Sequence, residues 1–112
     1  MAFYTYNGTP GADYLTDYNH SSFAQYPYIE FNTVYINGFG GDDYLSGLDL
    51  FSFYNINGGA GNDIVFGTYN PDVLAGDDPF DVVGGNDFLA GFGDNDALLG
   101  FGGNDTLIGG WD

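Results

Sequence analysis

A nine-residue pattern recurs along this chain and constrains its fold more than any other feature of the sequence. Segment 58–66 reads GGAGNDIVF, and segments 91–99 and 100–108 read GFGDNDALL and GFGGNDTLI. Each copy places glycines and an aspartate in a turn, followed by an apolar triplet. A turn and a short strand repeated at a fixed period are typical of a solenoid, in which each repeat packs only against its neighbours.

The copies follow the frame G-x-x-G-x-D-x-U-x, in which U is a large apolar residue. About eight copies cover most of the chain, and aspartates recur at intervals of nine in two series that overlap within GDDPFD (76–81). We interpret the overlap as one half-coil that is three residues short. Because side chains alternate along a strand, U should point inward and its neighbours outward. The U residues are Leu15, Leu45, Tyr54, Val65, Leu74, Leu89, Leu98 and Leu107.

The chain carries a large negative charge that no basic side chain balances. Its 112 residues include 16 acids, no lysine and no arginine, giving a formal charge of −16. Stacked carboxylates about 5 Å apart repel by ~3 kcal/mol at an effective dielectric constant of about 20. The 44% hydrophobic content nevertheless argues against disorder. Folding therefore requires cations from the solvent. Nucleic acids and anionic membranes are unsuitable partners, because binding them relies on lysine and arginine.

The motif GGAGND-x-V and its in-register copies resemble the RTX (repeats-in-toxin, hemolysin-type calcium-binding) family. The resemblance implies an all-β, right-handed parallel β-roll (β-solenoid) with two nonapeptides per coil and several Ca²⁺ ions bound in the turns. It also implies that carbonyls at positions one, three and five join the position-six carboxylate. Calcium accepts such oxygen ligands in flexible geometry, and ion binding would be coupled to folding.

The predicted metal-binding positions lie in the turns of the repeat, and the open alternative is that these are ordinary Asx turns. These positions are Asp13, Gly38, Gly40, Asp42, Asp43, Gly58, Ala60, Asn62, Asp63, Gly67, Asp72, Gly76, Asp78, Asp81, Gly84, Asn86, Asp87, Gly91, Gly93, Asn95, Asp96, Gly100, Gly102, Asn104 and Asp105. Coils of two nonapeptides place the turns in two groups. One edge would carry the turns that end at Asp43, Asp63, Asp78 or Asp81, and Asp96. The other would carry those that end at Ser52, Asp72, Asp87 and Asp105.

Two regions are predicted along the chain. Residues 1–37 would form an N-terminal cap or irregular β segment with one RTX-like turn (8–16), and residues 38–112 the RTX β-roll. Segment 17–37 has no nonapeptide turn, but its second half is rich in residues with β propensity. The alternative for this segment is a binding surface that displays Tyr18, Tyr26 and Tyr28.

These features predict a calcium-binding extracellular structural protein, secreted or at the cell surface, rather than an enzyme. The chain has no cysteine, lysine or arginine, and its one histidine, His20, has no evident catalytic partner. Apolar residues on both sides of U predict self-association into fibres or a matrix, or cover by neighbouring repeats of a longer chain. No membrane insertion is expected. The alternatives are an RTX segment of a larger secreted adhesin or enzyme and, less favoured, an ice-binding module. Type I secretion is implied only by the resemblance.

Overall fold

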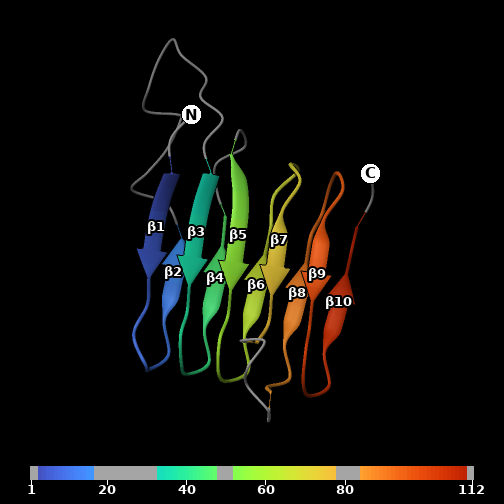
Figure 1. The fold of residues 1–112 in the computed structure, drawn as a ribbon. Coiled ribbons are helices and arrows are strands. Elements are labelled where there is room, and N and C mark those ends of the chain that lie inside the picture. Colours follow the sequence, from blue (N-terminus) through green and yellow to red (C-terminus); the bar gives the residue numbers. More distant parts are fainter. Residues whose placement is uncertain (1–2, 17–32, 48–51, 78–83, 111–112) are drawn as a thin grey trace.

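The computed structural model describes residues 3–16, 33–47, 52–77 and 84–110, and within them the chain is all-β. Short parallel strands stack into a β-solenoid, which confirms the predicted parallel β-roll (Figure 1). No helix in these ranges is long and apolar enough to cross a membrane. The strands are β1 (Phe3–Asn7), β2 (Tyr14–Thr16), β3 (Thr33–Asn37), β4 (Tyr44–Ser46), β5 (Phe53–Asn57), β6 (Ile64–Phe66), β7 (Val73–Ala75), β8 (Phe88–Ala90), β9 (Ala97–Leu99) and β10 (Thr106–Ile108).

Odd- and even-numbered strands form two separate five-stranded sheets. The odd sheet has the order β1-β3-β5-β7-β9, and the even sheet has the order β2-β4-β6-β8-β10. Every pairing among the described strands is parallel and in register; Leu45, for example, lies opposite Val65, which lies opposite Leu89. Because consecutive strands alternate between the sheets, two strands and two turns make one flattened coil.

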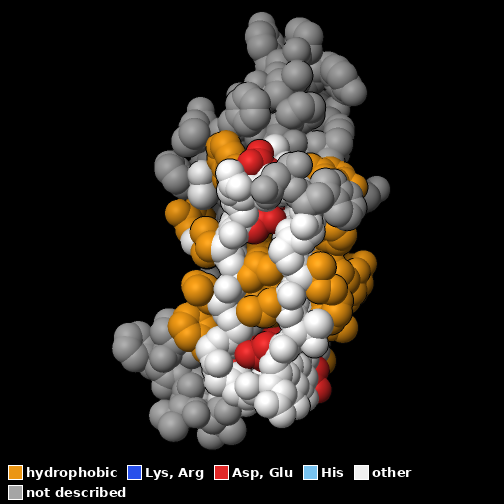
Figure 2. Space-filling view, turned by 90° about the vertical axis from the view of Figure 1, so that its right-hand side faces the viewer, with side chains coloured by type: hydrophobic (Ala, Val, Ile, Leu, Met, Phe, Trp, Pro, Cys, Tyr) orange, Lys and Arg blue, Asp and Glu red, His pale blue; other side chains and the backbone are white. Residues whose placement is uncertain are grey.

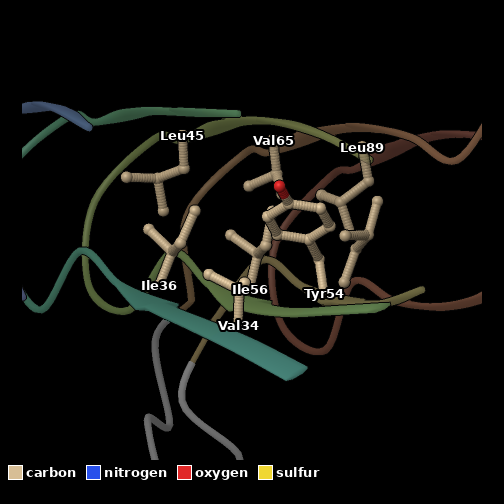
Figure 3. Packing of buried hydrophobic residues seen from close by; sticks show 8 residues of the cluster. Val34, Ile36, Leu45, Tyr54, Ile56, Val65 and Leu89 are labelled. Carbon is tan, nitrogen blue, oxygen red and sulfur yellow. The ribbon is translucent and has the colours of Figure 1, made fainter. Parts of the chain in front are cut away.

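The core fills the narrow space between the two sheets (Figure 3). The predicted inward positions from β4 to β8 are buried, whereas Leu15 and Leu98 are partly buried and Leu107, in the last strand, is 46% exposed. Val34, Ile36 and Ile56 complete this core because β3 and β5 are five residues long, a length that the nine-residue frame does not contain. The buried cluster is Val34, Ile36, Leu45, Tyr54, Ile56, Val65, Leu74 and Leu89.

The turns between the sheets form two edges of the solenoid. Turns of the first edge lead from the odd to the even sheet and lie at the bottom of Figure 1. They are 8–13, 38–43, 58–63 and 100–105, together with segment 76–87, of which residues 76–77 and 84–87 are described. Turns of the second edge lead back to the odd sheet, and its fully described turns are 67–72 and 91–96.

The predicted distribution of aspartates between the edges is wrong in part. Asp87 and Asp105 lie on the first edge with Asp63, not with Asp72, and Asp96 lies on the second edge with Asp72. The cause lies in segment 76–87, because β7 belongs to the odd sheet and β8 to the even sheet, whereas the predicted turn plus shortened half-coil would have placed β8 in the odd sheet. The edge of every later turn is therefore reversed relative to the prediction.

The same two sheets continue on both sides of the predicted boundary at residue 37. β1 pairs with β3, and β2 with β4, in the parallel register of the later strands. The division into a cap and a β-roll stays a prediction, because residues 17–32 lie outside the described ranges. The suggested tyrosine surface (Tyr18, Tyr26 and Tyr28) falls in the same segment.

Close stacking of the coils makes some glycines irreplaceable. Gly61 has φ of +119°, and a Cβ there would overlap the carbonyl oxygen of Gly41 in the preceding coil. We expect Gly61→Ala to lower the free energy of unfolding by at least about 2 kcal/mol, since backbone strain and overlap act together. Gly109→Ala is the matched control, because a Cβ there meets nothing within 4 Å. Denaturant unfolding of both variants would check this, and equal midpoints would contradict it.

Candidate metal centre

A ladder of hydrogen bonds joins the aspartates of the first edge. In each coil the backbone N–H of the position-six aspartate donates to Oδ1 of the corresponding aspartate in the next coil. The distances are 2.8 Å from Asp13 to Asp43, 2.9 Å from Asp43 to Asp63, 2.8 Å from Asp63 to Asp87 and 2.9 Å from Asp87 to Asp105. The sequence separations are 30, 20, 24 and 18 residues, so the ladder persists although the coils differ in length.

The second edge repeats this arrangement with fewer carboxylates. The N–H of Asp72 donates to Oδ1 of Asp96 at 2.9 Å, and the N–H of Tyr54 donates to Oδ1 of Asp72 at 3.0 Å. Ser52, which replaces the aspartate in its turn, is buried. This edge therefore concentrates less negative charge than the first edge.

On the first edge, the second carboxylate oxygen (Oδ2) of several aspartates lacks a hydrogen-bond partner. Oδ2 of Asp43, of Asp63 and of Asp87 is buried and accepts no hydrogen bond from any described residue. The side chains of these three residues are only 1–3% exposed, so bulk water does not solvate them. A buried charged oxygen without a partner is costly, and the sequence contains no lysine or arginine to pair with it. These oxygens call for a cation or for a proton.

The first glycine of each turn makes room for this oxygen. A Cβ on Gly38 would overlap Oδ2 of Asp43, and a Cβ on Gly58 would overlap Oδ2 of Asp63. The carbonyl oxygen of Gly58, in the next coil, lies against the same face of Gly38. Carboxylate and carbonyl oxygens from neighbouring coils thus approach one another, and oxygen ligands of this kind suit a hard divalent cation.

The densest group of carboxylates is the Asp triad, defined here as Asp77, Asp87 and Asp105. One carboxylate oxygen from each of the three residues lies within 4.8 Å of those from the other two, and Asp77 and Asp87 are buried. The N–H of Gly85 fixes Asp77 by donating to its Oδ1 at 2.9 Å. Three carboxylates at this spacing can hold a metal ion. The nine-residue frame did not predict Asp77 as a metal-binding position, because the second position of the other fully described turns carries glycine, phenylalanine or threonine.

Burial raises the pKa values of four aspartates in the turns, Asp43, Asp63, Asp72 and Asp87. It is the main cause for each of them, ahead of repulsion by neighbouring carboxylates. The pKa of Asp63 rises from 3.8 to about 7, with Asp87, Asp43 and Asp77 adding to the effect of burial. The pKa values of Asp72 and Asp87 rise to about 6, and that of Asp43 is also raised. Without a counter-ion, the folded chain therefore favours protonated carboxyl groups in these turns.

The structure groups the other predicted positions differently. Asn62 donates its backbone N–H to Oδ1 of Asp42, Asn86 donates to Oδ1 of Asn62, and Asn104 donates to Oδ1 of Asn86, each at 2.8 Å. These residues form an exposed outer ladder, in which Oδ1 of Asp42, Asn62 and Asn86 each already accepts a hydrogen bond. Ala60 and Asn95 are exposed, and Asp78 and Asp81 lie outside the described residues.

Comparison with known proteins adds no further identification. No protein-family model, curated protein or solved structure matches this chain. The Asp triad and the buried Oδ2 atoms are therefore interpreted from their geometry and charge alone.

Proposed function

We propose that this chain is a calcium-binding structural protein whose solenoid is stable only when cations occupy the first edge. One observation carries the proposal: buried carboxylate oxygens recur without a hydrogen-bond partner in a chain that has no lysine or arginine. A cation that binds the folded chain alone stabilises it by mass action, so binding and folding are coupled.

Calcium fits these turns better than other common metal ions. The described turns offer carboxylate and carbonyl oxygens, and the chain contains no cysteine. Soft metals prefer sulfur or imidazole ligands, whereas magnesium retains waters and requires a stricter octahedron. The RTX-like repeat supports the same choice. It also supports an extracellular location, where millimolar calcium would fold a chain that stays unfolded inside the cell.

Apolar outer faces support self-association of the folded protein. Figure 2 looks onto the β9–β10 end of the solenoid and shows hydrophobic side chains between the backbone strands and also on both outer flanks. Ile64, Leu99 and Ile108 are 41–47% exposed. Leu107 is 46% exposed although its counterpart Leu89 is fully buried, so one more coil stacked on β10 would cover it. A second copy stacked end to end supplies such a coil, and repeated contacts of this kind give a filament.

A calcium titration tests both parts of the proposal. In chelator the chain is expected to give the circular dichroism of a coil, and added calcium is expected to produce a cooperative β-sheet signal. Sedimentation velocity on the same samples should show larger species only in calcium. Magnesium at equal concentration is the control. A β-sheet spectrum that survives exhaustive chelation would overturn calcium-dependent folding, and a folded monomer in millimolar calcium would overturn self-association alone.

A further inference from the structure

Two turns differ from the rest because their aspartate is already fully bonded. In turn 67–72 the N–H of Thr68 donates to Oδ2 of Asp72 at 2.6 Å, and in turn 8–13 the N–H of Thr9 donates to Oδ2 of Asp13 at 2.6 Å. The threonine hydroxyl lies on the same carboxylate, 3.3 Å from Asp72 Oδ2 and 3.0 Å from Asp13 Oδ1. Oδ2 is the atom that has no partner in Asp43 and Asp63, whose turns have the same length.

Burial does not explain this difference. Asp72 and Asp43 are equally buried, each 3% exposed, yet only Asp72 has partners on both oxygens. What separates the two kinds of turn is the residue at the second position: threonine in turns 8–13 and 67–72, and glycine or phenylalanine at positions 39, 59, 92 and 101.

The backbone conformation at the second position explains the difference. Phe39, Gly59, Phe92 and Phe101 have φ values from +63° to +88°, whereas neither threonine has a positive φ. A β-branched side chain is strongly disfavoured at positive φ. Threonine therefore keeps the ordinary conformation, in which its N–H points at the carboxylate. The hydroxyl also accepts the N–H two residues later, at 3.2 Å from both Gly11 and Asn70, which fixes the turn.

We propose that threonine at the second position takes the place of the cation. Turns 8–13 and 67–72 then bind no ion, whereas turns 38–43 and 58–63 require one. In turn 67–72 an ion at Oδ2 of Asp72 would have to displace two hydrogen bonds, from Thr68 N and Thr68 Oγ1, and leave these buried donors without an acceptor. The inference rests on the proposed calcium binding. It also changes the role of three predicted metal-binding positions, because it places Asp13, Gly67 and Asp72 in turns that bind no metal.

Reciprocal substitutions test the inference through the number of ions bound per chain. Thr68→Gly removes the constraint on φ, and we expect one calcium more than in the wild type, counted by native mass spectrometry and isothermal titration calorimetry. Phe39→Thr imposes the constraint on an ion-requiring turn, and we expect one calcium fewer. Phe39 already has a Cβ and is 54% exposed, so this change adds no clash.

Two matched controls separate backbone conformation from other effects. Thr68→Val keeps the β-branch and the N–H but lacks the hydroxyl, and Phe39→Leu keeps a residue that is not β-branched; neither should change the ion count. If the wild type binds calcium while Thr68→Gly and Phe39→Thr leave the count unchanged, the role of threonine is overturned and calcium binding stands. If the wild type binds no calcium, the proposed function itself fails.

Discussion

Asp63→Asn is expected to stabilise the protein without calcium and to destabilise it with calcium. In the ion-free chain the substitution removes a buried charge whose pKa is raised from 3.8 to about 7. At about 1.4 kcal/mol per pKa unit, the gain above pH 7 is up to about 4 kcal/mol. In saturating calcium the variant loses a ligand, and a site held at about 100 times its Kd contributes about 2.7 kcal/mol. One substitution should therefore have opposite effects in the two conditions.

Asp42→Asn is the matched control for this reversal. It makes the same chemical change in the neighbouring turn, but the Asp42 side chain is exposed and its Oδ1 accepts the N–H of Asn62. Ion-free stability can be compared through the concentration of trimethylamine N-oxide needed to fold each variant, because this osmolyte favours burial. Calcium-bound stability can be compared through urea midpoints. A loss of stability for Asp63→Asn in both conditions would contradict a cation site at this carboxylate.

Low pH is expected to restore part of the folding stability that the protein lacks in the absence of calcium. The folded-state pKa of Asp63 is about 7 and those of Asp72 and Asp87 are about 6, against an ordinary value of 3.8. Because the folded chain binds protons more readily than the unfolded chain, protonation favours folding. This contribution is fully present below about pH 4 and is lost as the pH rises through about 7. The ion-free protein should thus gain several kcal/mol of stability on acidification.

Circular dichroism in chelator, followed from neutral pH to about pH 4, measures this effect. The β-sheet signal should rise as the pH falls, and Asp63→Asn should show a smaller rise because one of the four carboxyl groups with a raised pKa is gone. Calcium-bound protein should respond in the opposite direction, since protons compete with the ion for the same oxygens. An ion-free chain that remains a coil throughout this range would show that carboxylate repulsion is not what holds it unfolded.

The repeat alone predicted the architecture because it contains both periodicities that matter. Glycine and aspartate every nine residues mark the turns, and the alternation around U marks the buried face; Leu45, Val65 and Leu89 lie in the core as expected. Strand length was less predictable. Ile56 falls outside the nine-residue frame, but it extends β5 by one more inward position and is fully buried.

The details of the site depended on contacts that a nine-residue frame does not contain. The sheet to which β8 belongs decides which aspartates share an edge, and a spacing count across segment 76–87 cannot determine it. The buried position of Asp77 follows from the same connection. The difference between threonine-closed and open turns depends on the sign of φ at Thr68 and Phe39, which the motif leaves free at that position.

The ladder on the first edge has a direction, and this direction has a consequence for how the solenoid forms. Each aspartate N–H finds its acceptor in the coil that follows, as Asp43 does in Asp63. An earlier coil cannot complete this hydrogen bond until the coil that follows it has folded. We therefore expect folding to propagate from the C-terminal coils towards the N-terminal coils.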